Sequence, residues 1–161
     1  MDNNDILIRL RYALDLKNSD VKEIFTLGGE QVKAVDVPLI LTKTPDVDAE
    51  EPHEPNIPLT NDQLERFLNG LITFNRGPKP GASGPPEVTG EHINNLVLKK
   101  LRIALELTSD DLLDLWKKAG INVSKGELGA FLRKEGHKNY KELGEQLMRN
   151  LLKGITLNYR P

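Results

Sequence analysis

Histidines are the side chains best suited to acid–base chemistry near neutral pH, and this chain has three of them. His53 falls in an acidic, proline-rich loop, and His92 stands beside a stretch rich in proline and glycine. Only His137, in the run KEGHKNYKE, is expected at an ordered helix junction. There it could act as a base or bond the nearby backbone. We favour the second role because turns often recruit polar side chains for it.

The sequence lacks the motifs that hold metals, nucleotides or catalytic nucleophiles. None of the patterns HExxH, GxSxG, GxxxxGK and GxGxxG occurs, and the absence of cysteine excludes a disulfide framework, a thiolate ligand and a thiol nucleophile. The loop at 44–58 is rich in carboxylates but has neither the glycine nor the final glutamate of an EF-hand: Asp46, Asp48, Glu50, Glu51 and Glu54. We therefore predict no catalytic residue, no cofactor and no metal site, and a small-molecule enzyme is the least favoured class.

Basic side chains offer a second kind of chemistry, the binding of anions. With His137 they define a candidate binding surface: Arg11, Lys99, Lys100, Arg102, Arg133, Lys134, His137 and Lys138. Such a surface could contact the phosphates of nucleic acid. The run DDLLDLWKKAGINVSKGELGAFLRK also has the length and the glycine turn of a helix–turn–helix. Gly126 and Gly129 would weaken its recognition helix, so ordinary packing in a bundle is favoured.

The elements that must position these groups form an internal repeat. A shift of 91 places residues 4–43 on residues 95–134 without a gap, and beyond the next loop the shift becomes 84. Identical pairs include Asn4 with Asn95, Arg11 with Arg102, Gly29 with Gly120, Leu68 with Leu152, Gly70 with Gly154, and Arg76 with Arg160. Phe25 matches Trp116, and matched aromatic residues are expected in the core.

Each copy is predicted to contain four helices, because its apolar residues recur at helical spacing. The predicted ranges are 4–16, 19–27, 36–43 and 60–75 in the first copy, and 95–107, 109–118, 125–134 and 139–156 in the second. Three capping boxes support the helix starts: Thr60 with Gln63, Thr108 with Asp111, and Ser124 with Glu127. Gly29 and Gly120 are expected to end the second helix of each copy.

These patterns predict an all-α protein of two tandem four-helix repeats joined by a Pro/Gly-rich linker. The first repeat spans residues 1–77 and contains the acidic, proline-rich loop at 44–58. Residues 78–91 are the linker, and residues 92–161 are the second repeat.

Arg11 and Arg102 occupy the same phase of the first helix in the two copies. They could line a groove between the copies and meet an acidic ligand. The favoured interpretation is that each bonds a helix C-terminus or a nearby carboxylate, such as Asp20 or Asp111. Ordinary ion pairs of this kind are commoner than binding sites.

The two copies carry opposite charge. Residues 1–77 hold 8 basic and 14 acidic side chains, a net charge of −6, whereas residues 91–161 hold 13 basic and 9 acidic side chains, a net charge of +4. This split suggests that the halves meet different partners, or each other. The acidic loop could dock on the basic face of the second copy, within one chain or in a second chain, which makes a homo-oligomer a further hypothesis.

The expected setting is the cytoplasm, with no membrane partner. The N-terminal run MDNNDILIRLRYALDL carries acids and arginines among its apolar residues, unlike a signal peptide. No apolar run approaches the roughly 20 residues that span a bilayer. The lack of cysteine fits a reducing compartment.

Four blocks of the sequence resemble the bacterial YehS proteins: NDILIRLRYAL, FLNGLITFNRG, NNLVLKKLRIALELTSDDLLDL and HKNYKELGEQLMRNLLKG. That family is defined by a duplicated domain of unknown function. The resemblance implies a small cytoplasmic bacterial protein and carries over no activity, cofactor or catalytic residue. We therefore expect a non-catalytic helical interaction module whose target is protein or nucleic acid. The alternative is an RNA- or DNA-binding protein that uses the basic second repeat.

Overall fold

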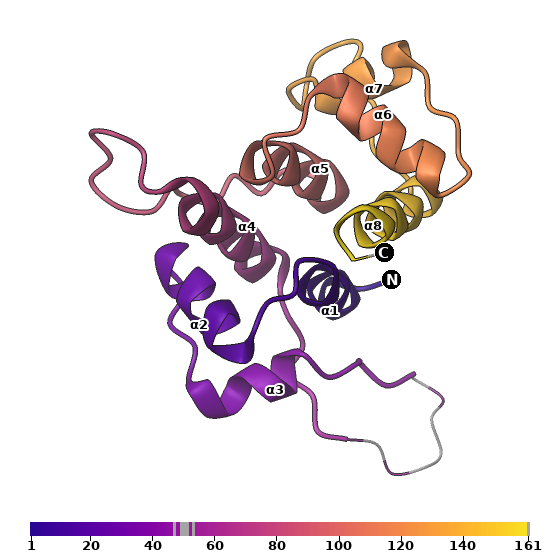
Figure 1. Ribbon diagram of the computed structural model, residues 1–161. Helices are drawn as coiled ribbons and strands as arrows, with labels where there is room; N and C mark the ends of the chain where they lie inside the picture. Colours follow the sequence, from indigo (N-terminus) through magenta and orange to yellow (C-terminus); the bar gives the residue numbers. More distant parts are fainter. Residues whose placement is uncertain (47, 49–51, 53, 161) are drawn as a thin grey trace.

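The computed structural model describes residues 1–46, 48, 52 and 54–160, and within them every regular element is a helix. Helices α1 (Asn3–Ala13), α2 (Asn18–Leu27), α3 (Val37–Ile40) and α4 (Asn61–Arg76) form the first repeat, with a short 3-10 helix η1 (Ala34–Asp36) before α3 (Figure 1). Helices α5 (Ile93–Ala104), α6 (Ser109–Lys118), α7 (Lys125–Leu132) and α8 (Glu145–Tyr159) form the second. The all-α prediction is confirmed. None of these helices is long and apolar enough to cross a membrane.

The capping boxes predicted from the sequence open α4, α6 and α7. At α4, Thr60 Oγ1 accepts from the Gln63 backbone N–H at 3.2 Å, and Gln63 Oε1 accepts from the Thr60 N–H at 2.9 Å. The exchange satisfies backbone donors that the first helical turn leaves unpaired. The predicted glycine stops are also present, because Gly29 and Gly120 take the left-handed conformation with φ of 91° and 86°.

Two predicted helix ends are wrong. The first helix of each repeat was expected to reach 16 or 107, but α1 ends at Ala13 and α5 at Ala104. The reason is a left-handed residue two positions later in each repeat, Asp15 with φ of 53° and Glu106 with φ of 52°. Left-handed backbone cannot continue a right-handed helix.

The third helix of each repeat and the fourth helix of the second repeat are shorter than predicted. The helix expected over 36–43 is divided into η1 and the four-residue α3, and the one expected over 125–134 ends at Leu132. The helix expected from residue 139 begins at Glu145. The backbone before it is bound elsewhere, because the Asn95 side chain donates to Lys141 O at 2.9 Å and accepts from Leu143 N at 2.9 Å.

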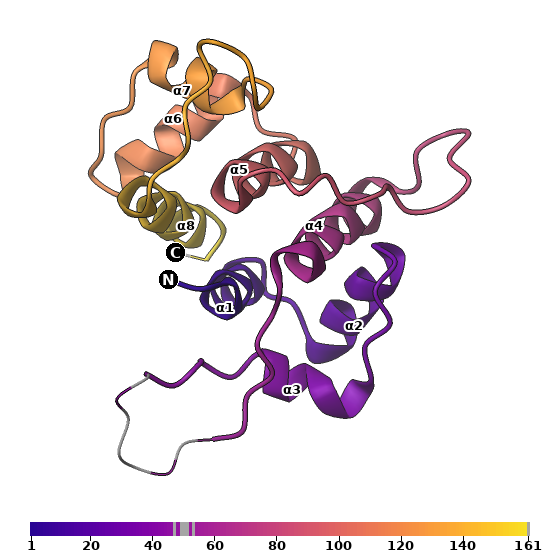
Figure 2. The same ribbon diagram turned by 180° about the vertical axis from the view of Figure 1, so that it is seen from behind.

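The two repeats interlock. Within each repeat the second helix packs against the fourth, α2 on α4 and α6 on α8. Across the repeats, the fourth helix of one packs against the first helix of the other, α4 on α5 and α1 on α8. Figures 1 and 2 show these four helices side by side at the centre, with α2 and α3 on one side and α6 and α7 on the other. Each repeat therefore packs its fourth helix against the first helix of the other repeat, so the two repeats are related by approximate two-fold symmetry.

All four central helices begin at the same end of the molecule. Asn3 Nδ2 donates to Asn61 Oδ1 at 2.8 Å, which joins the starts of α1 and α4. The Met1 amino group lies 3.4 Å from Glu145 Oε2, which joins the starts of α1 and α8. Asn94 Nδ2 donates to Glu145 Oε1 at 3.5 Å, which joins the starts of α5 and α8. The C-terminal ends of the same helices consequently lie towards the other end.

Each repeat depends on a glycine where its second and fourth helices cross. A Cβ at Gly70 would overlap the carbonyl oxygen of Ile24, and a Cβ at Gly154 would overlap that of Leu115. Backbone at this separation leaves no room for a side chain. The crossing explains why both repeats keep glycine inside a long helix, where it otherwise destabilises.

The matched aromatics lie in the core, as predicted. Phe25 and Trp116 are fully buried at equivalent places in α2 and α6. Phe25 packs on Phe67 of α4 with ring centroids 5.1 Å apart. Trp116 packs beside α8 and donates from Nε1 to the Leu147 carbonyl at 2.9 Å, so its one polar atom is satisfied.

Candidate functional site

Lys99 and Lys100 are neighbours in the sequence but face different parts of the molecule. Lys99 Nζ lies 3.6 Å from Glu91 Oε1 and 5.9 Å from the ring centroid of Tyr140. Lys100 instead lines a groove together with Arg76. The structure therefore does not bring these two lysines together as one basic face.

The surroundings of Lys99 are rich in carboxylates. The His92 backbone N–H donates to Glu135 Oε2 at 3.0 Å, and His92 Nδ1 lies 3.7 Å from Glu142 Oε2. Burial raises the pKa of Tyr140, and the negative charges of Glu135, Glu142 and Glu91 raise that pKa further. Glu91 therefore pairs with Lys99, and Glu135 and Glu142 add negative charge around the neighbouring Tyr140, which makes this region less favourable for phosphate.

Three cations of the candidate surface lie in the connection between α7 and α8. Arg133, Lys134 and Lys138 are exposed, and within the described chain none of them forms an ion pair. His137 is exposed beside them, and its Nδ1 accepts from the Asn139 backbone N–H at 3.0 Å. That bond matches the backbone-bonding role favoured for His137 from the sequence.

Two arginines tie the C-terminal ends of the central helices together across the repeats. Arg160 Nη1, just beyond α8, donates to the Tyr12 carbonyl at 3.1 Å and to Asp15 Oδ1 at 2.9 Å. Arg76 makes the equivalent contact at the end of α5, with the Ile103 carbonyl at 3.4 Å. The last carbonyls of a helix carry partial negative charge, which a cation offsets. These arginines therefore have a structural role.

Arg11 and Arg102 do not make the predicted ion pairs with Asp20 and Asp111. Asp20 accepts from the Lys17 N–H at 2.8 Å, and Asp111 accepts from the Thr108 N–H at 2.8 Å, so both aspartates cap helices. Arg102 is exposed, whereas Arg11 Nε is buried and has no hydrogen-bond partner within the described residues. Both arginines stand in the last turn of their helix, where a positive charge is favourable.

A groove of about 970 Å³ lies between the two repeats, where the C-terminal half of α4 faces α5. Residues of the segment that follows α4 also line the groove, and Figure 1 shows this segment as a loop that extends outward from the end of α4. The apolar lining of the groove comes from Leu27, Ile72, Ile103 and the prolines of 78–86, and its charged lining from Arg76, Lys79 and Lys100. Among the described residues no carboxylate lines this groove, so its charged lining consists of cations alone.

Asn69 of α4 lines the same groove and has an unusual environment. Its side chain is 2% exposed, and neither Oδ1 nor Nδ2 has a hydrogen-bond partner in the described part of the chain. Glu65, one turn earlier, is equally buried but is satisfied by Thr89 and Gly90, with distances from 2.8 to 3.2 Å. A buried amide without partners costs about 1–3 kcal/mol per group. Such an unpaired buried group is uncommon in folded proteins, and here it lies among residues that line the groove.

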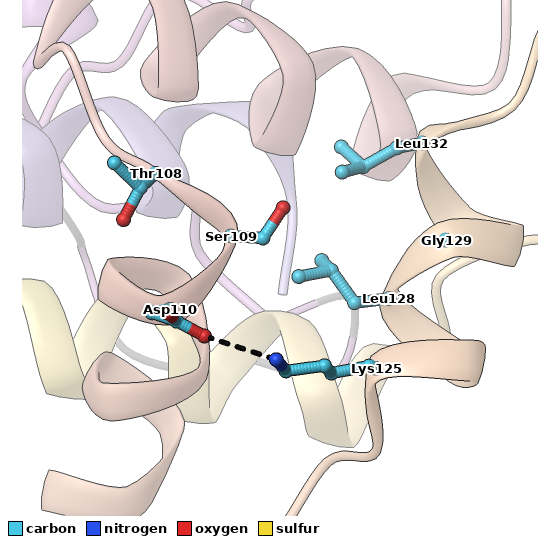
Figure 3. Close-up of a pocket in the computed structure, with 7 residues that line it drawn as sticks. All are labelled: Thr108, Ser109, Asp110, Lys125, Leu128, Gly129 and Leu132. Carbon is cyan, nitrogen blue, oxygen red and sulfur yellow. Dashed lines mark ion pairs between the residues drawn. The ribbon is translucent and has the colours of Figure 1, made fainter.

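A smaller pocket of about 390 Å³ lies between the start of α6 and α7. Figure 3 shows its lining residues, Thr108, Ser109, Asp110, Lys125, Leu128, Gly129 and Leu132. Lys125 Nζ lies 3.7 Å from Asp110 Oδ1, so its opposite charges pair with each other. No group of three or more metal-ligating side chains gathers here or elsewhere in the described residues. This pocket offers less to a ligand than the groove does.

The described carboxylates of the acidic loop make no ion pair with the described part of the second repeat. These carboxylates, Asp46, Asp48 and Glu54, are exposed, and Figures 1 and 2 place the two described ends of the loop beside α3, away from α6 and α7. Glu50, Glu51 and His53 lie outside the described residues. Docking of the loop on the second repeat, within the chain or in a second chain, stays a prediction.

Comparison with known protein families shows which family the chain belongs to. The sequence pattern of the family described as "Protein of unknown function (DUF1456)" matches residues 3–77 and 94–160. The chain belongs to this family. The relative "Uncharacterized protein YehS" of Escherichia coli (strain K12) is 38% identical over 160 residues, which cover 97% of this chain and 95% of the relative. No solved structure matches the chain. The resemblance to the YehS proteins and the tandem duplication are both confirmed.

Proposed function

We propose that this protein is a non-catalytic helical interaction module and that the groove between α4 and α5 is its binding surface. The observation that carries the proposal is the buried, unpaired Asn69 amide in a groove lined by cations. Both repeats build this groove, α4 from the first and α5 from the second. The duplication itself thus creates a surface that one repeat alone would lack.

The non-catalytic part rests on how the ionisable groups are arranged. The described ionisable groups of the groove are Arg76, Lys79 and Lys100, and a general acid–base pair needs a group that titrates near the working pH. His92 and His137 lie elsewhere, and each has a local partner. These observations favour binding over proton transfer.

Site-specific photo-crosslinking in cells that make the protein tests the proposal. A photoreactive phenylalanine analogue replaces Ser83 on the groove wall, and a matched control replaces Asn122, which is exposed between α6 and α7. We expect a covalent adduct from position 83, weakened by Lys100→Glu, and none from position 122. Equal adducts at both positions, or none at position 83, would contradict the proposal.

A nucleic-acid-binding role is the second candidate. It is favoured by the exposed Arg133, Lys134 and Lys138, which have no carboxylate partner in the described residues. A protein that uses them should bind a labelled single-stranded RNA with an affinity that falls steeply as the salt concentration rises. A plot of the logarithm of the binding constant against the logarithm of the salt concentration should have a slope of about −0.7 for each phosphate contact. Replacing all three with alanine should then flatten that slope. An unchanged slope would remove this candidate.

A further inference from the structure

We infer that the occupant of the groove is a short, extended protein segment with acidic side chains, an inference that rests on the function proposed above. Three features of the groove carry it: the unpaired carboxamide of Asn69, the uncompensated charges of Lys79 and Lys100, and an aliphatic lining.

The Asn69 carboxamide matches a peptide bond in its hydrogen-bonding groups. It offers donors at Nδ2 and an acceptor at Oδ1, and a peptide unit offers one carbonyl and one N–H. An extended segment leaves those backbone groups free for a partner, whereas a helix uses them internally. Both amide atoms of Asn69 are buried in the structure, so the amide must rotate into the groove on binding. A change of χ1 between staggered rotamers moves the amide there, and the broad terminal torsion then sets its orientation.

The charges of the groove favour acidic side chains in the partner. Arg76 already contacts the Ile103 carbonyl at 3.4 Å and Glu106 at 3.7 Å. Lys79 and Lys100 form no ion pair within the described residues. Lys100 is half-buried, and a charge partly withdrawn from water attracts an opposite charge more strongly. Two lysines without carboxylate partners thus favour a segment with aspartate or glutamate.

The lining favours a peptide over a nucleotide. Proteins that hold bases without reading their sequence stack them on aromatic rings, and no described residue of the groove is aromatic. Leu27, Ile72, Ile103 and several prolines offer aliphatic contact instead. A volume of about 970 Å³ has room for a few residues, because it lies near the upper end of ordinary ligand pockets. An acidic segment with an apolar side chain satisfies all three features.

Selection of peptides on the full chain tests the inference. Random dodecapeptides displayed on phage are selected on the wild-type protein, and the enriched peptides are synthesised and titrated by fluorescence anisotropy. We expect enrichment of aspartate or glutamate near an apolar residue. Lys100→Glu should weaken binding at least tenfold, whereas Lys125→Glu, a matched charge reversal at an exposed site outside the groove, should leave it unchanged.

Asn69→Leu adds a readout that separates binding from folding. Leucine has a similar size and removes two buried polar atoms that lack partners, so we expect this variant to be at least as stable as the wild type. The same variant should bind the selected peptides several-fold more weakly. If Asn69→Leu is more stable than the wild type but binds the peptides more weakly, the Asn69 amide contacts the ligand. If it binds the peptides as well as the wild type does, the inference is overturned.

Other outcomes distinguish a failure of this inference from a failure of the proposed function. If adducts form at position 83 but the selected peptides are not acidic, or none is enriched, the peptide assignment fails and the groove remains a binding surface. ATP and polyuridylate serve as competing probes. Binding of either probe that Lys100→Glu abolishes would replace the peptide by a nucleotide, and would also overturn the inference.

Discussion

The side chain of Asn95 is the most informative target for testing how the fold is held together. It is fully buried, donates from Nδ2 to Phe131 O at 3.0 Å and to Lys141 O at 2.9 Å, and accepts at Oδ1 from Leu143 N at 2.9 Å. One amide thus joins the start of α5 to the end of α7 and to the segment before α8. Asn4 makes the equivalent three bonds in the first repeat.

The expected cost of Asn95→Ala follows from the groups that it leaves unpaired. Three backbone groups lose their partner, and each unsatisfied buried group costs about 1–3 kcal/mol. Water that enters the space left by the side chain reduces the total, so we expect about 3–5 kcal/mol. A domain of this size is stable by roughly 5–15 kcal/mol, so the loss should be a large part of the free energy of unfolding.

Equilibrium unfolding in urea, followed by circular dichroism at the helical band, measures this loss. Asn94→Ala is the matched control, because Asn94 is the adjacent residue and is 6% exposed. It makes one good bond, to Leu143 O at 3.0 Å, and a longer one of 3.5 Å to Glu145. We expect about 1 kcal/mol for the control. If Asn95→Ala costs no more than Asn94→Ala, the reasoning about the buried amide is wrong.

Four further predictions concern stability. Gly154→Ala should lower the free energy of unfolding by about 1–3 kcal/mol, because its Cβ meets the Leu115 carbonyl. Gly129→Ala should raise it by up to about 1 kcal/mol, since that glycine lies inside α7 with open space around it. Glu106→Gly should also raise it, by about 1 kcal/mol, because it relieves a left-handed residue. The Thr108 backbone N–H lowers the pKa of Asp111 below 3.8, so its contribution to stability is present above pH 3.8 and is lost as pH falls through the lowered pKa.

Urea midpoints check each of these predictions. Equal effects of alanine at positions 154 and 129 would mean that the close helix crossing plays no part. A loss of stability in Glu106→Gly would show that its pair with Arg76, at 3.7 Å, outweighs the backbone strain. For Asp111, the midpoints of the wild type and Asp111→Ala should converge as the pH is lowered from about 5 to about 2.5. A constant difference over that range would contradict the assignment.

Local structure could be predicted from the sequence because local interactions produce it. The capping boxes at Thr60, Thr108 and Ser124 each use residues only three positions apart. Gly29 and Gly120 mark helix ends by a backbone conformation that glycine adopts easily. The apolar stripes gave the buried faces of the helices for the same reason.

The pairing of helices across the repeats could not be predicted in that way. A periodic apolar stripe shows which face of α4 is buried, but it does not say whether α1 or α5 covers that face. The start of α8 was misplaced because a side chain distant in the sequence, Asn95, binds the preceding backbone. The repeat alignment did hold a signal for this bond, because Asn4 and Asn95 match at one position of the first helix.

The lining of the groove that we propose as the binding surface was predicted only in part. Lys100 is in the groove, whereas Lys99, one residue earlier, faces Glu91 on another side of α5. One residue turns a helix by about 100°, so charge runs in the sequence do not define a face. Asn69 was missed altogether, because nothing in the run FLNGL distinguishes an unpaired buried amide from an exposed one.

The central claim is that the groove between the repeats binds a partner, and one spectrum tests it directly. The isotope-labelled full chain is titrated with the tightest selected peptide, and the side-chain amide signals of asparagine are followed. We predict that the Asn69 signals shift together with the backbone signals of Lys100 and Ile103, while those of the structural Asn95 stay in place. Shifts confined to residues 133–138, with the Asn69 signals unchanged, would contradict the claim.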